Sequence, residues 1–287
     1  MIIMNDIITA RELLYEAEGR LHSLEFARLD AELLLCNVMH LDRSKLFASP
    51  EMIIPLEKAM EYRRLINKRS EGQPTAYLTG KKEFWSLELM VNQYTLVPRP
   101  ETECLVELAL SKIPRESDIT VADLGTGSGA IAIAIATERP ACTIIATDIC
   151  IHALEIARLN ASSHGTQNIN FMISNWFENL DKKFNLIISN PPYIRNDDKH
   201  LGGDGIAHEP KLALRGGNDG MNSITSIVKD SVNHLINDGW LLIEHGHDQA
   251  DKVRAIYQQH GFIEIQSHCD YSGIERITSG KYKYDRI

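Results

Sequence analysis

The stretch Asp123-Leu124-Gly125-Thr126-Gly127-Ser128-Gly129-Ala130 decides the fold, because it joins an apolar strand pattern to an apolar helix pattern. Residues 120–124 predict a buried strand, and residues 130–137 predict a helix. Glycines between a strand and a helix let the chain turn tightly and let a ligand lie against the backbone. The stretch therefore predicts the first strand–loop–helix unit of a ligand-binding α/β sheet.

The chain after this unit continues to alternate strand and helix patterns. The predicted strands cover residues 143–147, 169–173, 186–189 and 239–244, and the predicted helices cover residues 151–162, 221–235 and 249–260. Residues 262–267 and 276–284 are predicted as closing strands, the latter at an edge of the sheet. This alternation predicts an α/β fold with a mainly parallel sheet covered by helices on both faces.

The chain before residue 73 predicts helices only. Thr9 and Glu12 form a capping-box pattern at the start of the first helix. A second helix is predicted over residues 24–39, a short third one after Asp42 and a fourth from residue 55. The inward positions are Leu29, Leu33 and Cys36 on the second helix and Leu56, Met60, Leu65 and Ile66 on the fourth. Residues 73–97 change to a period of two, which predicts a β-hairpin. We expect a helical bundle over 1–72, a hairpin linker over 73–97 and an α/β domain over 98–287.

Composition narrows the class of protein. The net charge of -9 over 287 residues argues against a surface built mainly to grip a phosphate backbone. Five scattered cysteines without a C-x-x-C pair are typical of reduced thiols in a cytosol. Residues 1–6 lack the pattern of a signal peptide, and no run approaches about 18 apolar residues. We therefore expect a cytoplasmic protein with no membrane contact.

The glycine loop predicts a ligand with an adenosine end but leaves its identity open. Gly125-x-Gly127-x-x-Ala130 also matches the dinucleotide fingerprint. Asp148 ends the next predicted strand, from which a carboxylate can hold two ribose hydroxyls. Asp123 favours a sulfonium cofactor, because its charge would repel a pyrophosphate. Asn175-Trp176-Phe177 follows a later strand and offers a polar contact and an aromatic wall for adenine, although packing of Trp176 over the sheet explains it equally well.

A second motif, Ser189-Asn190-Pro191-Pro192-Tyr193-Ile194, ends the apolar run of residues 186–188. Two consecutive prolines cannot continue a sheet, and the residue before a proline is pushed to extended geometry. Asn190 is therefore expected at the carboxyl end of its strand, where ligands bind in open parallel sheets. A fixed amide and a nearby aromatic ring suit a planar group that carries an NH2; the alternative interpretation is an ordinary strand end.

Together these motifs resemble those of S-adenosylmethionine-dependent methyltransferases with a Rossmann-like fold. Further motifs, together with the helical N-terminal part, resemble the HemK/PrmC family, which methylates a glutamine side-chain nitrogen in the GGQ loop of peptide chain release factors. These motifs are Pro98-Arg99-Pro100-Glu101-Thr102-Glu103, Glu209-Pro210-x-x-Ala213-Leu214, Gly216-Gly217-x-Asp219-Gly220 and Gly273-Ile274-Glu275-Arg276. The resemblance covers nearly the whole chain.

The resemblance implies a site and its partners. S-adenosylmethionine is expected to be held by Gly125, Thr126, Gly127, Ser128, Gly129, Asp148, Trp176 and Asn190. The glutamine is expected to be held by Asn190, Pro191, Pro192 and Tyr193, with Asn190, Pro191 and Tyr193 in catalysis. In this role the side-chain oxygen of Asn190 and the carbonyl of Pro191 accept from the glutamine NH2, and Tyr193 packs on the amide. The expected partners are release factors, with no direct nucleic acid contact, no metal and a monomeric chain.

Other interpretations stay open at this point. Asn-Pro-Pro-Tyr is shared with methyltransferases for adenine amines, so an exocyclic amine of a nucleic acid or a glutamine of a ribosomal protein are alternative substrates. A non-catalytic nucleotide-binding module with a partner-docking bundle is another alternative. The bundle has two interpretations, substrate recognition or a stabilising cap. The segment of residues 98–103 either starts a helix, with Thr102 and acidic residues in its first turn, or belongs to the site. His245 and His247 do not make a metal site by themselves.

Overall fold

The computed structural model describes residues 8–284 and divides the described chain into two compact units. The first unit runs to Gly80 and also contains Gly202–His208, while the second holds Lys81–Leu201 and the chain from Glu209 onward. The described polypeptide therefore passes between the units at residues 80–81, 201–202 and 208–209. This division differs from the expected boundaries after residues 72 and 97. Residues 1–6, on which the expectation of no signal peptide rested, lie outside the described residues.

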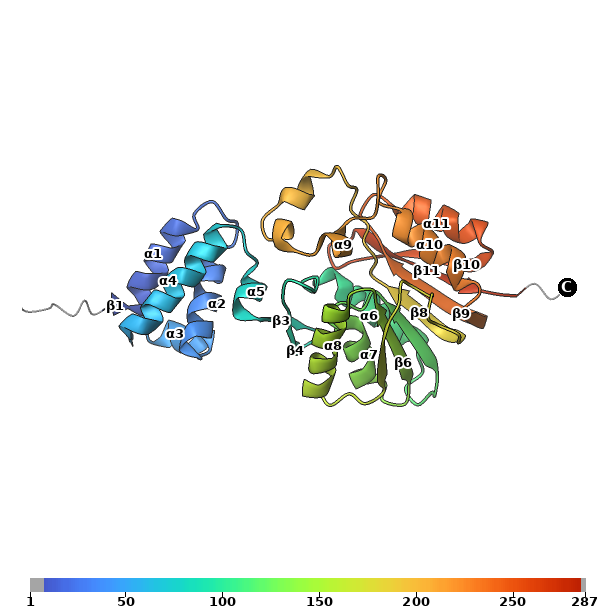
Figure 1. Ribbon diagram of the computed structural model, residues 1–287, viewed down its shortest axis with the longest axis horizontal. Helices are drawn as coiled ribbons and strands as arrows, with labels where there is room; N and C mark the ends of the chain where they lie inside the picture. Colours follow the sequence, from blue (N-terminus) through green and yellow to red (C-terminus); the bar gives the residue numbers. More distant parts are fainter. Residues whose placement is uncertain (1–7, 285–287) are drawn as a thin grey trace, which may run out of the picture. The chain divides into compact units, whose positions relative to one another are not determined.

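The first unit is a helical bundle with one short pair of strands (Figure 1). Its elements are β1 (Ile8–Thr9), α1 (Ala10–Arg20), α2 (Ala27–Met39), α3 (Arg43–Ala48), β2 (Ile53–Ile54), α4 (Leu56–Ser70), α5 (Thr75–Thr79) and the short 3-10 helix η2 (Ile206–His208). The predicted capping box is confirmed. The Thr9 hydroxyl accepts from the Glu12 N–H, and the Glu12 carboxylate accepts from the Thr9 N–H at 2.8 Å.

The inward faces of α2 and α4 differ from the prediction. Leu29 and Leu33 are 38% and 37% exposed, and Leu56 and Met60 are 66% and 62% exposed. The core positions are instead Ala31, Leu34, Leu35, Val38, Ala59 and Tyr62, with Cys36, Leu65 and Ile66 buried as predicted. The inward face of α2 was predicted wrongly because the helix carries three adjacent leucines. Such a run fits either of two neighbouring faces, so the sequence pattern does not show which face is buried.

The segment of residues 202–208 belongs to the bundle because its side chains bond there. Arg69, only 6% exposed, donates from Nε to Asp30 at 2.8 Å. Its two terminal nitrogens donate to Asp204, a partner 135 positions later in the chain. His208 contacts the carbonyl of Glu71 at 3.2 Å through Nε2. A charged side chain this deeply buried is tolerated because both carboxylates bond it.

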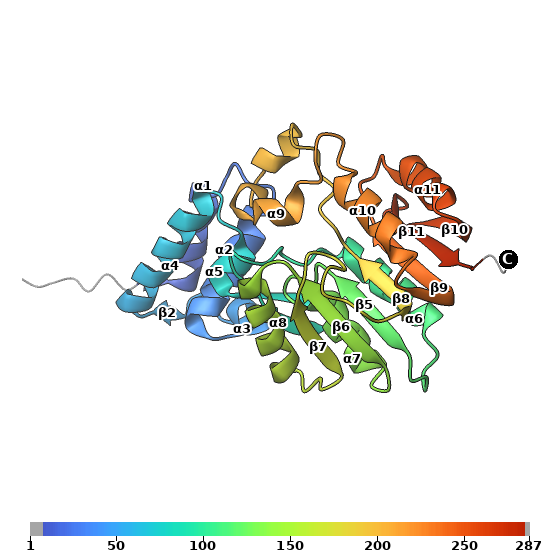
Figure 2. The same ribbon diagram turned by 45° about the vertical axis from the view of Figure 1, so that its right-hand side comes forward.

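The described part of the second unit is built around a seven-stranded sheet with strand order β10-β11-β9-β8-β5-β6-β7 (Figure 2). Its strands are β5 (Thr120–Leu124), β6 (Thr143–Asp148), β7 (Ile169–Ile173), β8 (Phe184–Ser189), β9 (Leu235–Glu244), β10 (Phe262–Cys269) and β11 (Glu275–Tyr282). The five strands from β9 to β7 pair in parallel, and β11 pairs antiparallel with both β9 and β10. The predicted α/β fold is confirmed.

Helices cover both faces of this sheet, as predicted. They are α6 (Glu101–Lys112), α7 (Ala130–Glu138), α8 (Ile151–Ser163), α10 (Asn222–Ser231) and α11 (Ala250–Gln259). The short helices η1 (Lys199–Gly202, 3-10) and α9 (Lys211–Leu214) come between β8 and α10 in the chain. Leu186 and Ile188 pack in the core with α6 and α7, whereas Ile187 between them packs with α10 and α11. This alternation is the period of two expected for a strand buried on both faces.

Two other sequence predictions are corrected at the margins of the sheet. The strand at the edge is β10, whereas β11 lies between β10 and β9. Its buried positions include the polar residues Thr278 and Ser279, so the sequence did not mark it as interior. The hairpin β3 (Lys81–Phe84) and β4 (Leu87–Met90) is not a separate linker, because Phe84 and Leu89 are buried in the core with α6 and α7. No helix among residues 8–284 is long and apolar enough to cross a membrane.

Candidate active site

The candidate site lies where the sheet changes direction. The chain goes from β5 outward to β6 on one side and returns to β8 on the other, so the loops after β5 and β8 diverge. Leu124 at the end of β5 pairs with Ser189 at the end of β8, so Gly125 and Asn190 leave the sheet side by side. A cavity of about 650 Å³ opens at this point. Its walls include the predicted residues Gly125, Thr126, Gly127, Ser128, Asp148, Trp176, Asn190 and Pro192.

The glycine loop is held by the strand next to it. The N–H groups of Gly125 and Thr126 both donate to the carbonyl of Thr147 at 2.8 Å. Gly125 has a positive φ of 74°, and a Cβ there would meet the ring of Trp176 at 3.3 Å. The positive φ therefore favours a glycine, and a Cβ would in addition crowd the ring of Trp176. Trp176 also forms a wall of the cavity together with Asn175, whereas Phe177 is buried and stacks on His234.

Asp148 closes the same side of the cavity. One carboxylate oxygen accepts from the Gly127 N–H at 2.9 Å, and the other accepts from the Cys150 N–H at 2.9 Å. Burial raises the pKa of Asp148, while these backbone donors act in the opposite direction. The carboxylate is thus fixed at the wall of the cavity, at the end of β6, where the sequence predicted it.

Asp123 is buried one layer deeper. It is fully buried and is not among the residues that line the cavity, whereas Thr126, which donates to Asp123 Oδ2 at 2.6 Å, is. The other oxygen, Oδ1, has no hydrogen-bond partner among the described residues. Burial raises the pKa of Asp123 to about 7. Its direct role is therefore to hold Thr126.

Asn190 contacts α6 from the other side of the cavity. Its Nδ2 donates to the Thr102 hydroxyl oxygen at 3.1 Å. The segment before α6 was predicted either to start a helix or to belong to the site, and Pro98, Arg99 and Thr102 line the cavity. Thr102 does not cap its helix, whose N-cap residue is Pro100 without a side-chain hydrogen bond. The segment therefore both starts α6 and forms a wall of the candidate site.

Tyr193 points its hydroxyl away from the strand end toward β9. The hydroxyl donates to Glu244 Oε1 at 3.3 Å, and the Tyr193 carbonyl accepts from Gln249 Nε2 at 3.0 Å. Burial, and next the charge of Glu244, raise the pKa of Tyr193. Neither Tyr193 nor Pro191 and Gly129 is among the residues lining the cavity. The motif is therefore held on both ends, by α6 at Asn190 and by β9 and α11 at Tyr193.

Comparison with known proteins places this geometry in a family. Residues 12–80 match the PrmC N-terminal domain, and residues 103–259 match the methyltransferase small domain. The release factor glutamine methyltransferase of Coxiella burnetii is 45% identical over 87% of this chain and 90% of its own length. That of Escherichia coli is 42% identical over 94% and 97%. The chain belongs to the release factor glutamine methyltransferase family.

This membership confirms the resemblance drawn from the motifs. A solved methyltransferase from Pyrococcus furiosus has a TM-score of 0.53 at 16% identity, covering 69% of this chain and 90% of that one. At this identity the likeness supports the fold alone, and it agrees with the α/β sheet described above.

The glycine-rich motif of residues 216–220 packs on the backbone of the Asn-Pro-Pro-Tyr motif. The Gly216 N–H donates to the Ile194 carbonyl at 2.8 Å. A Cβ on Gly216 would lie 2.7 Å from the carbonyl oxygen of Pro192 and 2.8 Å from the Cα of Tyr193, which is too close for any side chain. The motif is therefore a backbone support for the loop after Asn190.

Glu209, in another family motif, holds the segment before α6. Its side chain is 1% exposed, accepts from the Val97 N–H at 2.9 Å and pairs with Arg99. Pro210 and the following residues of α9 line the cavity together with Arg99. Glu209 thus joins two parts of the cavity wall that are 110 positions apart in the chain.

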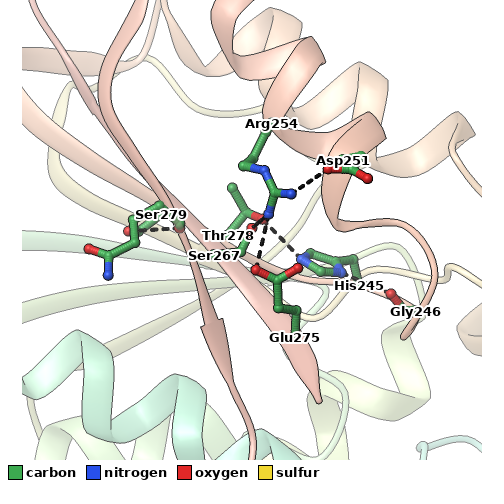
Figure 3. Close-up of polar contacts among 9 residues, drawn as sticks. His245, Gly246, Asp251, Arg254, Ser267, Glu275, Thr278 and Ser279 are labelled. Carbon is green, nitrogen blue, oxygen red and sulfur yellow. Dashed lines mark hydrogen bonds and ion pairs between the residues drawn. The ribbon is translucent and has the colours of Figure 1, made fainter. Parts of the chain in front are cut away.

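His245 has a structural role in this arrangement. It is fully buried; its Nδ1 contacts the Gly246 carbonyl and its Nε2 contacts the Thr278 hydroxyl, both at 2.9 Å (Figure 3). Arg254 donates to Ser267, which contacts Thr278, and so extends the network. Desolvation lowers the pKa of His245. Both ring nitrogens are already used within the protein.

The sequence interpretation missed several residues that support the site. Glu244, Gln249 and Asn160 were not predicted, and Thr102 was considered only at the start of its helix. Asn160 is fully buried, donates to the carbonyls of Ser128 and Met90 and accepts from the Met90 N–H at 2.7 Å, which ties β4 to the glycine loop. Glu244 carries a usable signal, because a carboxylate that ends an apolar strand is the same pattern that identified Asp148.

Proposed function

We propose that this chain transfers a methyl group from S-adenosylmethionine to the side-chain amide nitrogen of a glutamine in a peptide chain release factor. The observation that carries the proposal is that the glycine loop, Asp148 and Asn190 line one cavity at the switch point of the sheet. The names of relatives that share 90% or more of their length with the chain supply the class of substrate.

The residues of the cavity fit S-adenosylmethionine. Asp148 presents a fixed carboxylate for ribose hydroxyls, Gly125 presents bare backbone, and Trp176 offers an apolar wall. The volume of about 650 Å³ lies within the roughly 300–1,000 Å³ typical of small-molecule sites. When bound, the cofactor would supply an electrophilic methyl group on a cationic sulfur.

The protein's own contribution is orientation of the glutamine. An amide nitrogen is a poor nucleophile, because its lone pair is delocalised into the carbonyl. Acceptance of its N–H groups by Asn190 Oδ1 and the Pro191 carbonyl would fix the plane of the amide and aim the nitrogen. Positioning of this kind is worth up to about 7–11 kcal/mol in favourable cases. Transfer of the methyl group would release S-adenosylhomocysteine and leave the amide nitrogen with an extra proton. This cation is strongly acidic and loses its proton to water, so no strong base is required in the cavity.

Mass spectrometry tests the proposal directly. An intact release factor is incubated with the protein and S-adenosylmethionine, and its peptides are sequenced by fragmentation. We expect a mass gain of one methyl group on the glutamine of the GGQ loop, and none when that glutamine is replaced by glutamate. With the enzyme variant Asn190→Ala the gain should appear at least about 10²-fold more slowly. Labelling of a ribosomal protein or a nucleic acid in place of the factor would assign the same site to a different substrate.

We further propose that the bundle recognises the body of the release factor. Leu56 and Met60 lie one turn apart on α4 and are 66% and 62% exposed, although both are apolar. The double variant Leu56→Ser/Met60→Ser is expected to lower kcat/KM for the intact factor and leave kcat/KM for a short loop peptide unchanged. Leu159→Ser, at a 53% exposed position of α8, serves as the control. Equal losses on factor and peptide would rule out this role.

A further inference from the structure

The side chain of Asn190 can bind a substrate NH2 in only one of its two orientations. Its oxygen accepts hydrogen bonds and its nitrogen only donates them, so a flipped amide would repel the group it should hold. In the structure Nδ2 donates to the Thr102 hydroxyl at 3.1 Å, which leaves Oδ1 for other partners. A hydroxyl, however, can donate as well as accept. The contact with Thr102 fixes the amide only if the hydroxyl proton is committed elsewhere.

Glu244 is placed to take that proton. Burial raises the pKa of Glu244 to about 7, and the Thr102 side chain beside the carboxylate acts in the opposite direction, in favour of the ionised form. Glu244 is 2% exposed, and its Oε2 makes no hydrogen bond of ordinary geometry with any described residue, while Oε1 accepts from Tyr193 at 3.3 Å. Leaving a buried carboxylate oxygen without a partner is costly, so a nearby donor is strongly favoured. Thr102 is free to be that donor, because it does not cap α6.

We propose that Glu244 is a positioning residue that sets the orientation of the Asn190 amide through Thr102. The carboxylate accepts the Thr102 hydroxyl proton, and Thr102 then accepts from Asn190 Nδ2. The Asn190 oxygen is thereby left to accept from the substrate NH2. The same carboxylate accepts from Tyr193, so one buried group holds both ends of the Asn-Pro-Pro-Tyr motif. This inference rests on the function proposed above and adds the residue that prepares its site.

Charge explains why a carboxylate suits this position better than an amide. An ionised Glu244 has only acceptors, so Thr102 must donate toward it. A glutamine at 244 could donate to Thr102, whose proton would then be free to turn toward Asn190. The groups that act on Glu244 are the Tyr193 hydroxyl after β8, Thr102 and Glu101 of α6, and Arg276 of β11. Burial opposes ionisation most strongly; among the neighbouring groups, the charge of Glu101 also opposes it, whereas Thr102, Tyr193 and Arg276 favour it.

Turnover of four variants provides the test. Thr102→Val removes the hydroxyl, whereas Thr102→Ser keeps it. Glu244→Gln keeps the shape of the carboxylate but removes its charge. The control Thr143→Val removes a threonine hydroxyl at the start of β6, at the end of the parallel strands opposite the cavity. We expect kcat, at saturating cofactor and release factor, to fall about tenfold or more in Thr102→Val and Glu244→Gln, the size of one well-formed hydrogen bond. Thr102→Ser and Thr143→Val should stay within about threefold of the parent. A fifth variant combines Thr102→Val with Glu244→Gln. Its kcat should be little lower than that of either single variant, because both changes break the same chain of hydrogen bonds.

An NMR readout separates this inference from the proposed function. The side-chain amide signals of Asn190 are assigned by their loss in Asn190→Asp. We expect them to shift in Thr102→Val and Glu244→Gln and to stay in place in Thr143→Val. Unmoved Asn190 signals, or parental kcat in both Thr102→Val and Glu244→Gln, would overturn the inference. A parent that methylates no release factor would overturn the proposed function instead, and the NMR comparison would still decide the orientation. Should Glu244→Gln fail to fold, the two Thr102 variants decide alone.

Discussion

On the β5–β6 side of the cavity most of the hydrogen bonds come from backbone amides, whereas on the β8–β9 side they come from side chains of several elements. Gly125, Thr126 and Gly127 bond through their N–H groups to the adjacent strand β6. Asn190 depends on Thr102, 88 positions away, and Tyr193 on Glu244, 51 positions away. A site for a nucleoside can thus be built from a short local stretch. A slot for one planar amide needs side chains brought together by the whole fold.

The largest effect is expected on the side-chain half of the cavity. Asn190→Ala removes the acceptor while the prolines still set the backbone, and misplacement of about 1 Å can cost about 10²-fold in rate. We predict a loss of at least about that size in kcat under saturating conditions. Asn190→Asp should retain more activity, because it keeps an acceptor oxygen. Cofactor affinity is measured by calorimetry in parallel, and equal activities of the two variants would contradict the acceptor role.

The backbone half should respond in binding more than in rate. Asp148→Ala removes a charged acceptor at the end of β6, and such hydrogen bonds contribute about 1.5–3 kcal/mol. We predict a Kd for S-adenosylhomocysteine that rises by roughly 10- to 150-fold, with a smaller change in kcat at saturating cofactor. Titration calorimetry measures the affinity, and circular dichroism confirms the fold. An unchanged Kd in a folded variant would remove Asp148 from the cofactor site.

The support beneath Asn-Pro-Pro-Tyr is tested through stability. Gly216→Ala would place a Cβ 2.7 Å from the Pro192 carbonyl oxygen, so backbone must move. We predict a loss of about 1–3 kcal/mol in the free energy of unfolding. Gly202→Ala is the matched control, because no atom of the described residues beyond its chain neighbours lies within 4 Å of its Cβ position. Similar urea midpoints for both variants would show that the close contact at Gly216 relaxes freely.

The smallest effect is expected in the pH dependence of stability, to which one buried carboxyl group from each half of the cavity contributes. Asp123 and Glu244 ionise at about 7 in the folded protein, against 3.8 and 4.5 as ordinary values. Between these values the unfolded chain binds fewer protons, so their burial makes stability fall as pH rises from about 4 to about 7. The free energy of unfolding of Asp123→Asn and of Glu244→Gln should therefore rise relative to that of the parent as pH increases from about 4 to about 7. A difference from the parent that stays constant with pH, in urea titrations, would contradict the raised pKa.

The same contrast explains which parts of the site the sequence predicts. Asp148, Trp176 and Asn190 line the cavity as expected, because each follows a strand that the apolar pattern locates. The pairing of Thr102 with Asn190 and of Glu244 with Tyr193 was not predicted, because the partners are distant in the chain; for Glu244, only its place at the end of an apolar strand was available as a local signal. The exposed face of α2 was assigned wrongly for a similar reason, since only tertiary contacts choose among three adjacent leucines. The catalytic roles of Pro191 and Tyr193 stay predictions.

The bundle's use of residues 202–208 has a consequence for synthesis. When Arg69 is synthesised, its partner Asp30 is already part of the nascent chain, whereas Asp204 is added 135 positions later. At about 5–20 residues per second, this interval lasts roughly 7–27 s. During that time the two terminal nitrogens of Arg69 lack their partner Asp204, so any folding of the N-terminal unit must leave them hydrated. The bundle is therefore completed only after β5 to β8 have been synthesised, so its maturation is timed by the second unit.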